Sequence, residues 1–116
     1  MTDDASFEVT ESEPNGVPVL NARGEIDVAT APEFHEALAE MISHTPQLVI
    51  ANLTDVSFID STGLGVLVGA LRDVRTAGGD LRLVVTQPQI IKLLELTGLD
   101  KVFEIVSDTE DAVAAR

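Results

Sequence analysis

The spacing of apolar residues changes along the chain and predicts alternating strands and helices. Residues 7–11 alternate between apolar and polar, and the turn-forming Pro14-Asn15-Gly16 leads from them into a second apolar stretch. This arrangement predicts an antiparallel hairpin at the start of the chain. Residues 48–53 are almost uniformly apolar, as in a central strand that is covered on both faces. The expected strands cover residues 7–11, 17–22, 48–53, 81–85 and 102–106.

Helices are expected in the stretches where apolar residues recur every three or four positions. One helix begins at Ser61 or Thr62 and runs to about Thr76, where Gly78-Gly79 stops it. We expect Ser61 to be its N-cap, after a polar connector at residues 54–57. The other three helices each follow a sequence that resembles a capping box, a Ser or Thr with Glu or Gln three residues later. These three expected caps are Thr30, Thr86 and Ser107.

The predicted order of elements is β-β-α-β-α-β-α-β-α, which is typical of an α/β fold. The hairpin gives the sheet an antiparallel start, and the later strands are expected to be parallel with right-handed crossovers. The length of 116 residues suits one domain. We therefore expect a single domain over residues 1–116 with a mixed sheet, in which residues 1–5 are disordered.

The charge of the chain bears on its partners. Twenty acidic residues against seven basic ones give a net charge of −13. Nucleic acids and anionic membranes are poor partners for such a surface, because binding to phosphate backbones relies on Lys and Arg. A protein partner with a basic docking surface fits better, although acidity also serves solubility alone.

The sequence contains no cysteine, which excludes disulfides and thiolate metal sites. The acidic N-terminus lacks the basic and apolar regions of a secretory signal. Apolar stretches stay shorter than the roughly 18 residues of a membrane span. The expectation is a soluble, cytoplasmic protein.

Glycines at the start of the second helix raise the question of nucleotide binding. The spacing from Gly63 to Gly69 is G-x-G-x-x-x-G, one residue longer than the dinucleotide-binding fingerprint. Asp60 would also place a carboxylate where the pyrophosphate should bind. No Gly-Lys-Ser/Thr follows a glycine run, which excludes a Walker P-loop. The sequence therefore disfavours these nucleotide-binding motifs.

Enzyme chemistry at Ser61 or Asp60 lacks the groups that it would need. Ser61 has Asp60 and Thr62 beside it, where a nucleophile elbow has glycines. His35 and His44 are expected on the surface, with no companion to make a catalytic base or a metal site. A receiver domain phosphorylated on Asp60 would need further carboxylates at a neighbouring strand end to hold Mg²⁺.

Small residues occupy one side of the second helix, away from its expected core stripe. They are Gly65, Gly69 and Ala70, with Val66 as an apolar neighbour. Glycine inside a helix costs roughly 0.5–1 kcal/mol relative to alanine. This cost suggests close approach either of a partner or of another element of this chain, and spacing does not distinguish them.

Asp60-Ser61-Thr62-Gly63-Leu64-Gly65-Val66-Leu67 resembles the phosphorylation motif of bacterial anti-sigma factor antagonists, which are single-domain STAS proteins. The resemblance covers nearly the whole chain, since further motifs match in order and spacing. They are Gly24-Glu25-Ile26-Asp27, Ala31-Pro32, Ala77-Gly78-Gly79 and Thr97-Gly98-Leu99.

The resemblance implies a STAS-type sheet and a partner-switching function. The unphosphorylated protein would bind a cognate anti-sigma factor and so free a sigma factor. That anti-sigma factor, commonly an ATP-dependent serine kinase, would phosphorylate Ser61, with Thr62 as the second candidate, and a serine phosphatase would reverse the reaction. The chain would then be a substrate and a ligand, neither an enzyme nor the holder of a cofactor. The residues assigned to partner binding are Asp27, Asp60, Thr62, Gly63, Gly65, Val66 and Gly69.

A phosphate on Ser61 would add a charge of about −1.5 to −2. Free N–H groups at a helix N-terminus favour such a charge within the fold. Asp60 would repel it, as would Asp27 if the two loops converge. We therefore expect a folded protein whose docking surface is disrupted.

Two other hypotheses remain open at this point. One is a STAS module that binds or scaffolds without being phosphorylated, and the other is a small nucleotide-binding protein or enzyme. Phosphorylation of Ser61 by a kinase, or nucleotide binding by the isolated chain, distinguishes them.

Overall fold

The structure is a computed structural model that describes residues 7–44 and 46–114. The disorder expected for residues 1–5 lies outside the described residues. In the described part, the predicted order of strands and helices is confirmed, with two short 3-10 helices at Pro14–Gly16 and Leu99–Lys101 in addition. The strands are β1 (Phe7–Ser12), β2 (Val19–Ile26), β3 (Leu48–Ile59), β4 (Asp80–Val84) and β5 (Glu104–Val106). The helices are α1 (Ala31–Ile42), α2 (Ser61–Thr76), α3 (Pro88–Leu96) and α4 (Thr109–Ala114).

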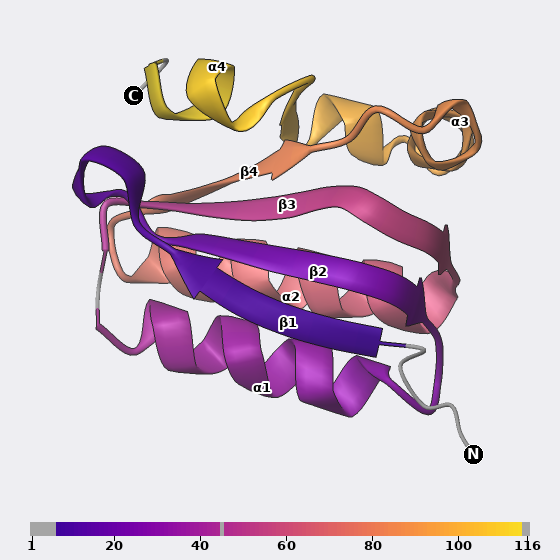
Figure 1. Cartoon of the computed structure of the whole chain (residues 1–116), viewed down its shortest axis with the longest axis horizontal. Helices are drawn as coiled ribbons and strands as arrows, with labels where there is room; N and C mark the ends of the chain where they lie inside the picture. Colours follow the sequence, from indigo (N-terminus) through magenta and orange to yellow (C-terminus); the bar gives the residue numbers. More distant parts are fainter. Residues whose placement is uncertain (1–6, 45, 115–116) are drawn as a thin grey trace.

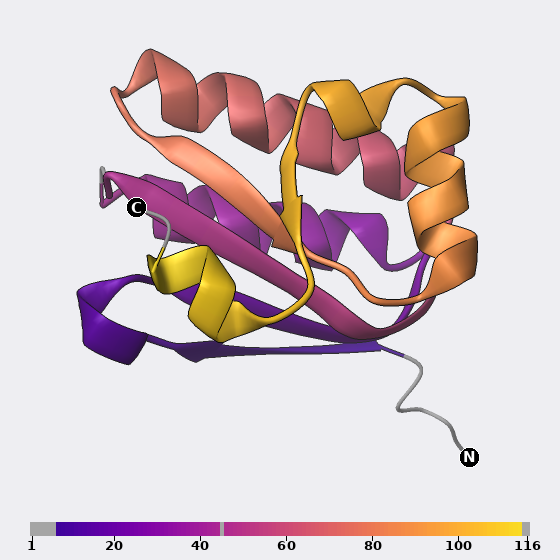
Figure 2. The ribbon, with the colours of Figure 1, turned by 90° about the horizontal axis from the view of Figure 1, so that it is seen from above.

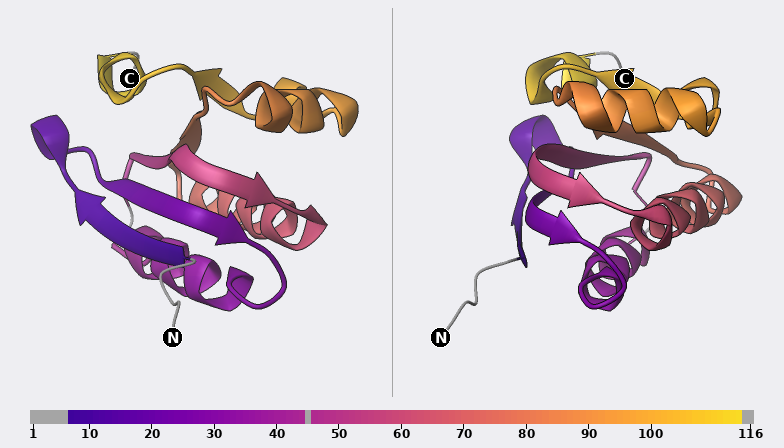
Figure 3. Two further views of the ribbon diagram at one scale, coloured as in Figure 1. Left: turned by 45° about the vertical axis from the view of Figure 1, so that its right-hand side comes forward. Right: turned by 90° about the vertical axis from the view of Figure 1, so that its right-hand side faces the viewer.

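The five strands form one mixed sheet in the order β1-β2-β3-β4-β5. β1 and β2 are antiparallel, and β2, β3, β4 and β5 run parallel to their neighbours. This is the mixed sheet that the sequence predicts. Helices α1 and α2 lie side by side against one face, and α4 covers part of the other (Figures 1 and 3).

Apolar side chains, most of them aliphatic, fill both interfaces of the sheet. The larger core lies between the sheet and helices α1, α2 and α3, with Phe34, Leu20 and Leu67 fully buried. The smaller core lies under α4, where Ala112 and Val113 pack on the amino-terminal parts of β2 and β3. In Figure 2, α4 stops short of the carboxyl ends of these strands, beside which α3 stands.

The expected connector at residues 54–57 is wrong, because β3 continues without a break to Ile59. Its register against β2 shifts twice, so that β3 has an extra residue at each shift. The buried positions in this stretch are Leu53, Val56 and Ile59, three residues apart. Such β-bulges place extra polar residues between the apolar ones. The stretch therefore lacks the strict apolar-polar alternation that predicts a strand, and it resembles a loop.

The capping boxes expected at Thr86 and Ser107 are wrong, whereas Thr30 is the N-cap residue of α1, as expected, but lacks the side-chain bond of a capping box. The Thr30 hydroxyl donates to the Glu25 carbonyl oxygen at 2.8 Å instead of bonding an N–H group of α1. Gln87, rather than Thr86, stands before α3. Before α4, the Asp108 carboxylate accepts a hydrogen bond from the Asp111 N–H at 2.7 Å.

Candidate functional site

Two aspartates follow neighbouring strands at the carboxyl edge of the sheet. Ile26 at the end of β2 pairs with Ile59 at the end of β3, and Asp27 and Asp60 come directly after them. The Asp60 N–H donates to the Ile26 carbonyl oxygen at 3.2 Å, which ties the two loops together. The loops therefore converge, as the sequence analysis required for a joint site.

The cap of α2 is Asp60, and the prediction that Ser61 is the N-cap is wrong. The Asp60 Oδ1 accepts hydrogen bonds from the N–H groups of Thr62 at 2.9 Å and Gly63 at 3.2 Å. Ser61 is consequently the first residue of the helix, and both Ser61 and Thr62 are exposed. An aspartate is a strong N-cap because its charge also faces the positive end of the helix dipole.

This cap changes the setting of a phosphate on Ser61. The sequence analysis expected free N–H groups at the helix start to favour the added charge, but Asp60 already accepts from two of them. A phosphate would therefore meet a carboxylate that is fixed in place beside it. The carboxylate of Asp60 therefore disfavours a phosphate on Ser61, whereas free N–H groups would have favoured it.

Asp27 is held within its own turn. Its Oδ1 accepts from the N–H groups of Ala29 at 2.9 Å and Thr30 at 3.2 Å. The Thr30 hydroxyl oxygen in turn accepts from the Asp27 N–H at 2.9 Å. This turn fixes the Asp27 backbone and carboxylate next to the start of α2.

Gly63 has an internal position. It is buried, and a Cβ there would lie 2.7 Å from both Ile26 Cγ2 and Ile59 Cγ1. Its assignment to the partner-binding surface is therefore corrected, because its missing side chain lets α2 approach the sheet.

The outer face of α2 is open at Gly65 and Gly69. Apart from its chain neighbours and the backbone of the adjacent helix turns, a Cβ at either position would meet no atom of the described chain within 4 Å. Packing against an element of this chain therefore does not explain these two glycines. Val66 beside them is partly buried against the core, whereas Ala70 is buried and faces inward, contrary to its expected place on the outer side.

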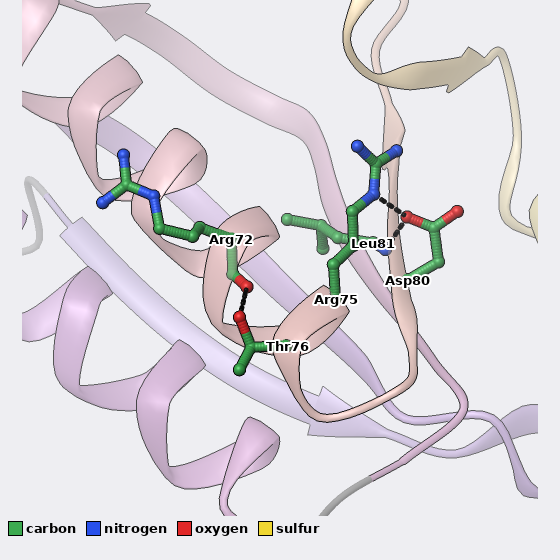
Figure 4. Close-up of polar contacts among 5 residues, drawn as sticks. All are labelled: Arg72, Arg75, Thr76, Asp80 and Leu81. Atoms are coloured by element: carbon green, nitrogen blue, oxygen red, sulfur yellow. Dashed lines mark hydrogen bonds and ion pairs between the residues drawn. The ribbon is translucent and has the colours of Figure 1, made fainter.

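Basic residues stand at the carboxyl-terminal end of the same helix (Figure 4). The Arg75 Nε donates to Asp80 Oδ1 at 3.1 Å, and that oxygen also accepts from the Leu81 N–H at 2.9 Å. The guanidinium of Arg72 is exposed and points away from this pair. A shallow hollow of about 460 Å³ lies at this end of α2 and is lined by Val68, Leu71, Arg72, Arg75 and Thr76.

Three residues near the site escaped the sequence analysis. Val28, in the loop of Asp27, and Phe58, near the end of β3, are large apolar residues that are 74% and 47% exposed. The Gln87 side-chain amide donates to the carbonyl oxygens of Leu53, at 2.7 Å, and Val56. It thereby occupies the edge of β3 beyond the end of β4. An apolar residue directly after a turn-forming Asp was the available signal for Val28, while the contacts of Gln87 join residues far apart in sequence.

The described residues contain no group of three or more His, Asp or Glu side chains suited to a metal ion. His35 and His44 are both exposed, as expected. Among the helices that the structure describes, none has the length and apolar character needed to cross a bilayer.

Comparisons with known proteins place this geometry in a family. The STAS domain model matches residues 8–112. The anti-sigma-B factor antagonist of Bacillus subtilis is 40% identical over 94 residues, which cover 81% of this chain and 85% of that protein. The corresponding antagonist of Listeria monocytogenes is 38% identical over 100 residues, covering 86% of this chain and 87% of that protein.

Solved structures agree. An anti-sigma factor antagonist from Mycobacterium paratuberculosis superimposes with a TM-score of 0.89 at 29% identity, covering 99% of this chain and 97% of that one. The anti-sigma factor antagonist SpoIIAA in its unphosphorylated form shares the fold, with a TM-score of 0.74 at 23% identity and 92% of each chain covered. By its sequence match over nearly the whole chain and by its fold, this protein belongs to the STAS domain family.

Proposed function

We propose that the protein is an anti-sigma factor antagonist that is switched by phosphorylation of Ser61. The observation that carries this proposal is the exposed Ser61 hydroxyl at the first position of α2, beside the fixed carboxylate of Asp60. The antagonists of Bacillus subtilis and Listeria monocytogenes support the general function. The partner is an anti-sigma factor that is also a serine kinase, and a serine phosphatase resets the switch in the cytoplasm.

The chain contributes a hydroxyl and a surface, while the kinase contributes the chemistry. The Ser61 Oγ attacks the γ-phosphorus of ATP held by the kinase, ADP leaves, and the hydroxyl proton passes to a base of the kinase. The N-cap of Asp60 and the turn around Asp27 hold the Ser61 backbone in one place for this step. Pre-positioning of this kind lowers the entropy that the kinase must remove.

Release follows from the charge of the product. A phosphoserine at position 61 carries about −1.5 to −2 charges beside Asp60 and must be desolvated when the partner docks. A 10- to 1000-fold loss of affinity requires only about 1.4–4 kcal/mol. The fold itself is expected to persist, because Ser61 and Thr62 are exposed and bury no apolar surface.

Phosphorylation is tested with the purified chain, ATP and each anti-sigma serine kinase encoded in the same genome. Intact mass should show one added phosphoryl group on the wild-type chain and on Thr62→Ala, and none on Ser61→Ala. Phosphate that persists on Ser61→Ala would assign the switch elsewhere. If none of these kinases adds a phosphate, the hypothesis of a STAS module that binds without being phosphorylated is favoured. ATP binding by the chain alone would favour a nucleotide-binding protein.

Binding to the kinase separates the effect of charge from that of side-chain shape. Ser61→Asp should weaken binding to the partner by at least tenfold. Ser61→Asn, whose side chain has the shape of aspartate without its charge, should retain most of the affinity. Isothermal titration calorimetry measures both. Equal affinities of these two variants would mean that charge at position 61 is not what releases the partner.

A further inference from the structure

The described residues leave part of the sheet face opposite α1 and α2 uncovered. On this face, α4 packs over Val19 in β2 and over Leu48 and Ile50 in β3. Phe58 lies eight residues beyond Ile50, which is roughly 26 Å at the rise of a strand. The carboxyl ends of β2 and β3 extend past α4 in Figure 2. In the part of the chain that the structure describes, the short helix therefore leaves the surface around Phe58 open.

Phe58 lies on this open face of the sheet. Its neighbour Ile59 is buried in the core beneath α1 and α2, and side chains of adjacent strand residues point to opposite faces. Glu25, which pairs with Phe58 across β2 and β3, is exposed as well. Phe58 is 47% exposed, so about half of a phenyl ring faces solvent three residues before Ser61.

Acidic residues lie on the same stretch of β2 and β3 as this ring and at the adjacent edge of the sheet. Glu25 and Asp55 are exposed on β2 and β3, and Asp27 and Asp60 lie at the adjacent edge of the sheet. Arg23 is the cation that pairs in register with Asp55, and its guanidinium bonds Glu8 Oε1 at 3.3 Å. An apolar ring beside acidic residues complements a partner that offers an apolar pocket bordered by Arg or Lys. A second copy of this chain has a hollow bordered by Arg72 and Arg75, but its net charge of −13 disfavours association with an equally acidic surface.

We infer that the surface of Phe58, Glu25 and Asp55 is a second contact area for the anti-sigma kinase, which inserts the Phe58 ring into an apolar pocket with a basic rim. This inference rests on the proposed function. It adds a contact on the sheet face, away from the outer face of α2. The partner would then contact the protein on both sides of the Ser61 loop. Aromatic side chains that become fully buried in a partner commonly dominate the affinity of an interface.

The test compares Phe58→Ala with Leu96→Ala, an apolar residue that is 74% exposed on α3. Titration calorimetry against the kinase that phosphorylates Ser61 should show affinity at least tenfold weaker for Phe58→Ala and unchanged for Leu96→Ala. Thermal unfolding of both variants confirms that they are folded. Ser61→Asp is measured in the same series as the reference for the switch.

A pair of charge reversals tests the basic rim without touching the ring. Glu25→Lys should weaken binding at low salt by about tenfold, with the difference shrinking as salt is added. Glu36→Lys, at an exposed position of α1, changes the net charge equally and should have a smaller effect. Equal effects of the two reversals would mean that only the net charge of the chain matters.

The outcomes separate this inference from the proposed function. Wild-type affinity of Phe58→Ala together with weak binding of Ser61→Asp would overturn the inference and leave the switch standing. Sedimentation that shows a wild-type dimer and a monomeric Phe58→Ala would overturn it too, since the face would then join two copies of this chain. A kinase that neither binds nor phosphorylates the wild-type chain would overturn the proposed function and the inference with it.

Discussion

The inner and outer faces of α2 use the same residue type for opposite reasons. On the inner face, Gly63 fits against Ile26 and Ile59, where a Cβ would come within 2.7 Å of both side chains. On the outer face, a Cβ at Gly65 or Gly69 would meet no described atom within 4 Å beyond its chain neighbours and the adjacent helix backbone. The first glycine is required by the packing of this chain, and the other two are not.

The difference leaves the two outer glycines unexplained by packing among the described residues. Each glycine inside a helix costs roughly 0.5–1 kcal/mol relative to alanine. Close packing with the sheet compensates for this cost at Gly63. No contact among the described residues compensates for it at Gly65 and Gly69. Under the proposed function, a partner that approaches the helix backbone closely would supply the compensation.

Gly63→Ala should have the largest effect on stability. We expect the free energy of unfolding to fall by about 1–3 kcal/mol, because the added methyl group overlaps Ile26 and Ile59 and forces α2 away from the sheet. The greater helix propensity of alanine offsets only part of this loss. Urea unfolding followed by circular dichroism measures it. An unchanged or higher midpoint would contradict the internal role of Gly63.

Ala70→Gly should have the next largest effect. Ala70 is 6% exposed on the inner face, so the change removes a buried methyl group and introduces glycine into the middle of the helix. The two effects together should lower the free energy of unfolding by about 1–2 kcal/mol. Residue 69 provides the matched control in the same turn, where Gly69→Ala should act in the opposite direction. If the two changes had the same sign, the faces would be wrongly assigned.

The sequence alone predicted the order of the elements, the mixed sheet and the end of α2 at Thr76. The spacing of apolar residues and the glycines that end helices are local signals, and they were sufficient to predict these features. The extension of β3 to Ile59 was missed because bulges spaced its inward residues three apart. Such shifts of register depend on the neighbouring strand, which local pattern does not describe.

The candidate site was only partly predicted, because some of its features also depend on contacts between distant parts of the chain. Asp27, Asp60 and Ser61 were identified, and the structure brings their loops together. The capping role was given to Ser61 because serine and aspartate are about equally good N-caps, and only the backbone geometry selects Asp60. The burial of Gly63 depends on the distance between α2 and two isoleucines from different strands.

Gly65→Ala and Gly69→Ala should have the smallest effects on the fold and should separate stability from binding. Each should raise the free energy of unfolding by roughly 0.5–1 kcal/mol, because alanine favours the helix and its methyl group meets nothing. Each should also weaken binding to the anti-sigma kinase, because the added methyl group holds the partner away from the helix backbone. Thr76→Ala, exposed at the far end of α2, is the control for binding. Alanine variants that are more stable and bind as tightly as the wild type would show that no partner approaches here, and the cost of the two glycines would then have no compensation.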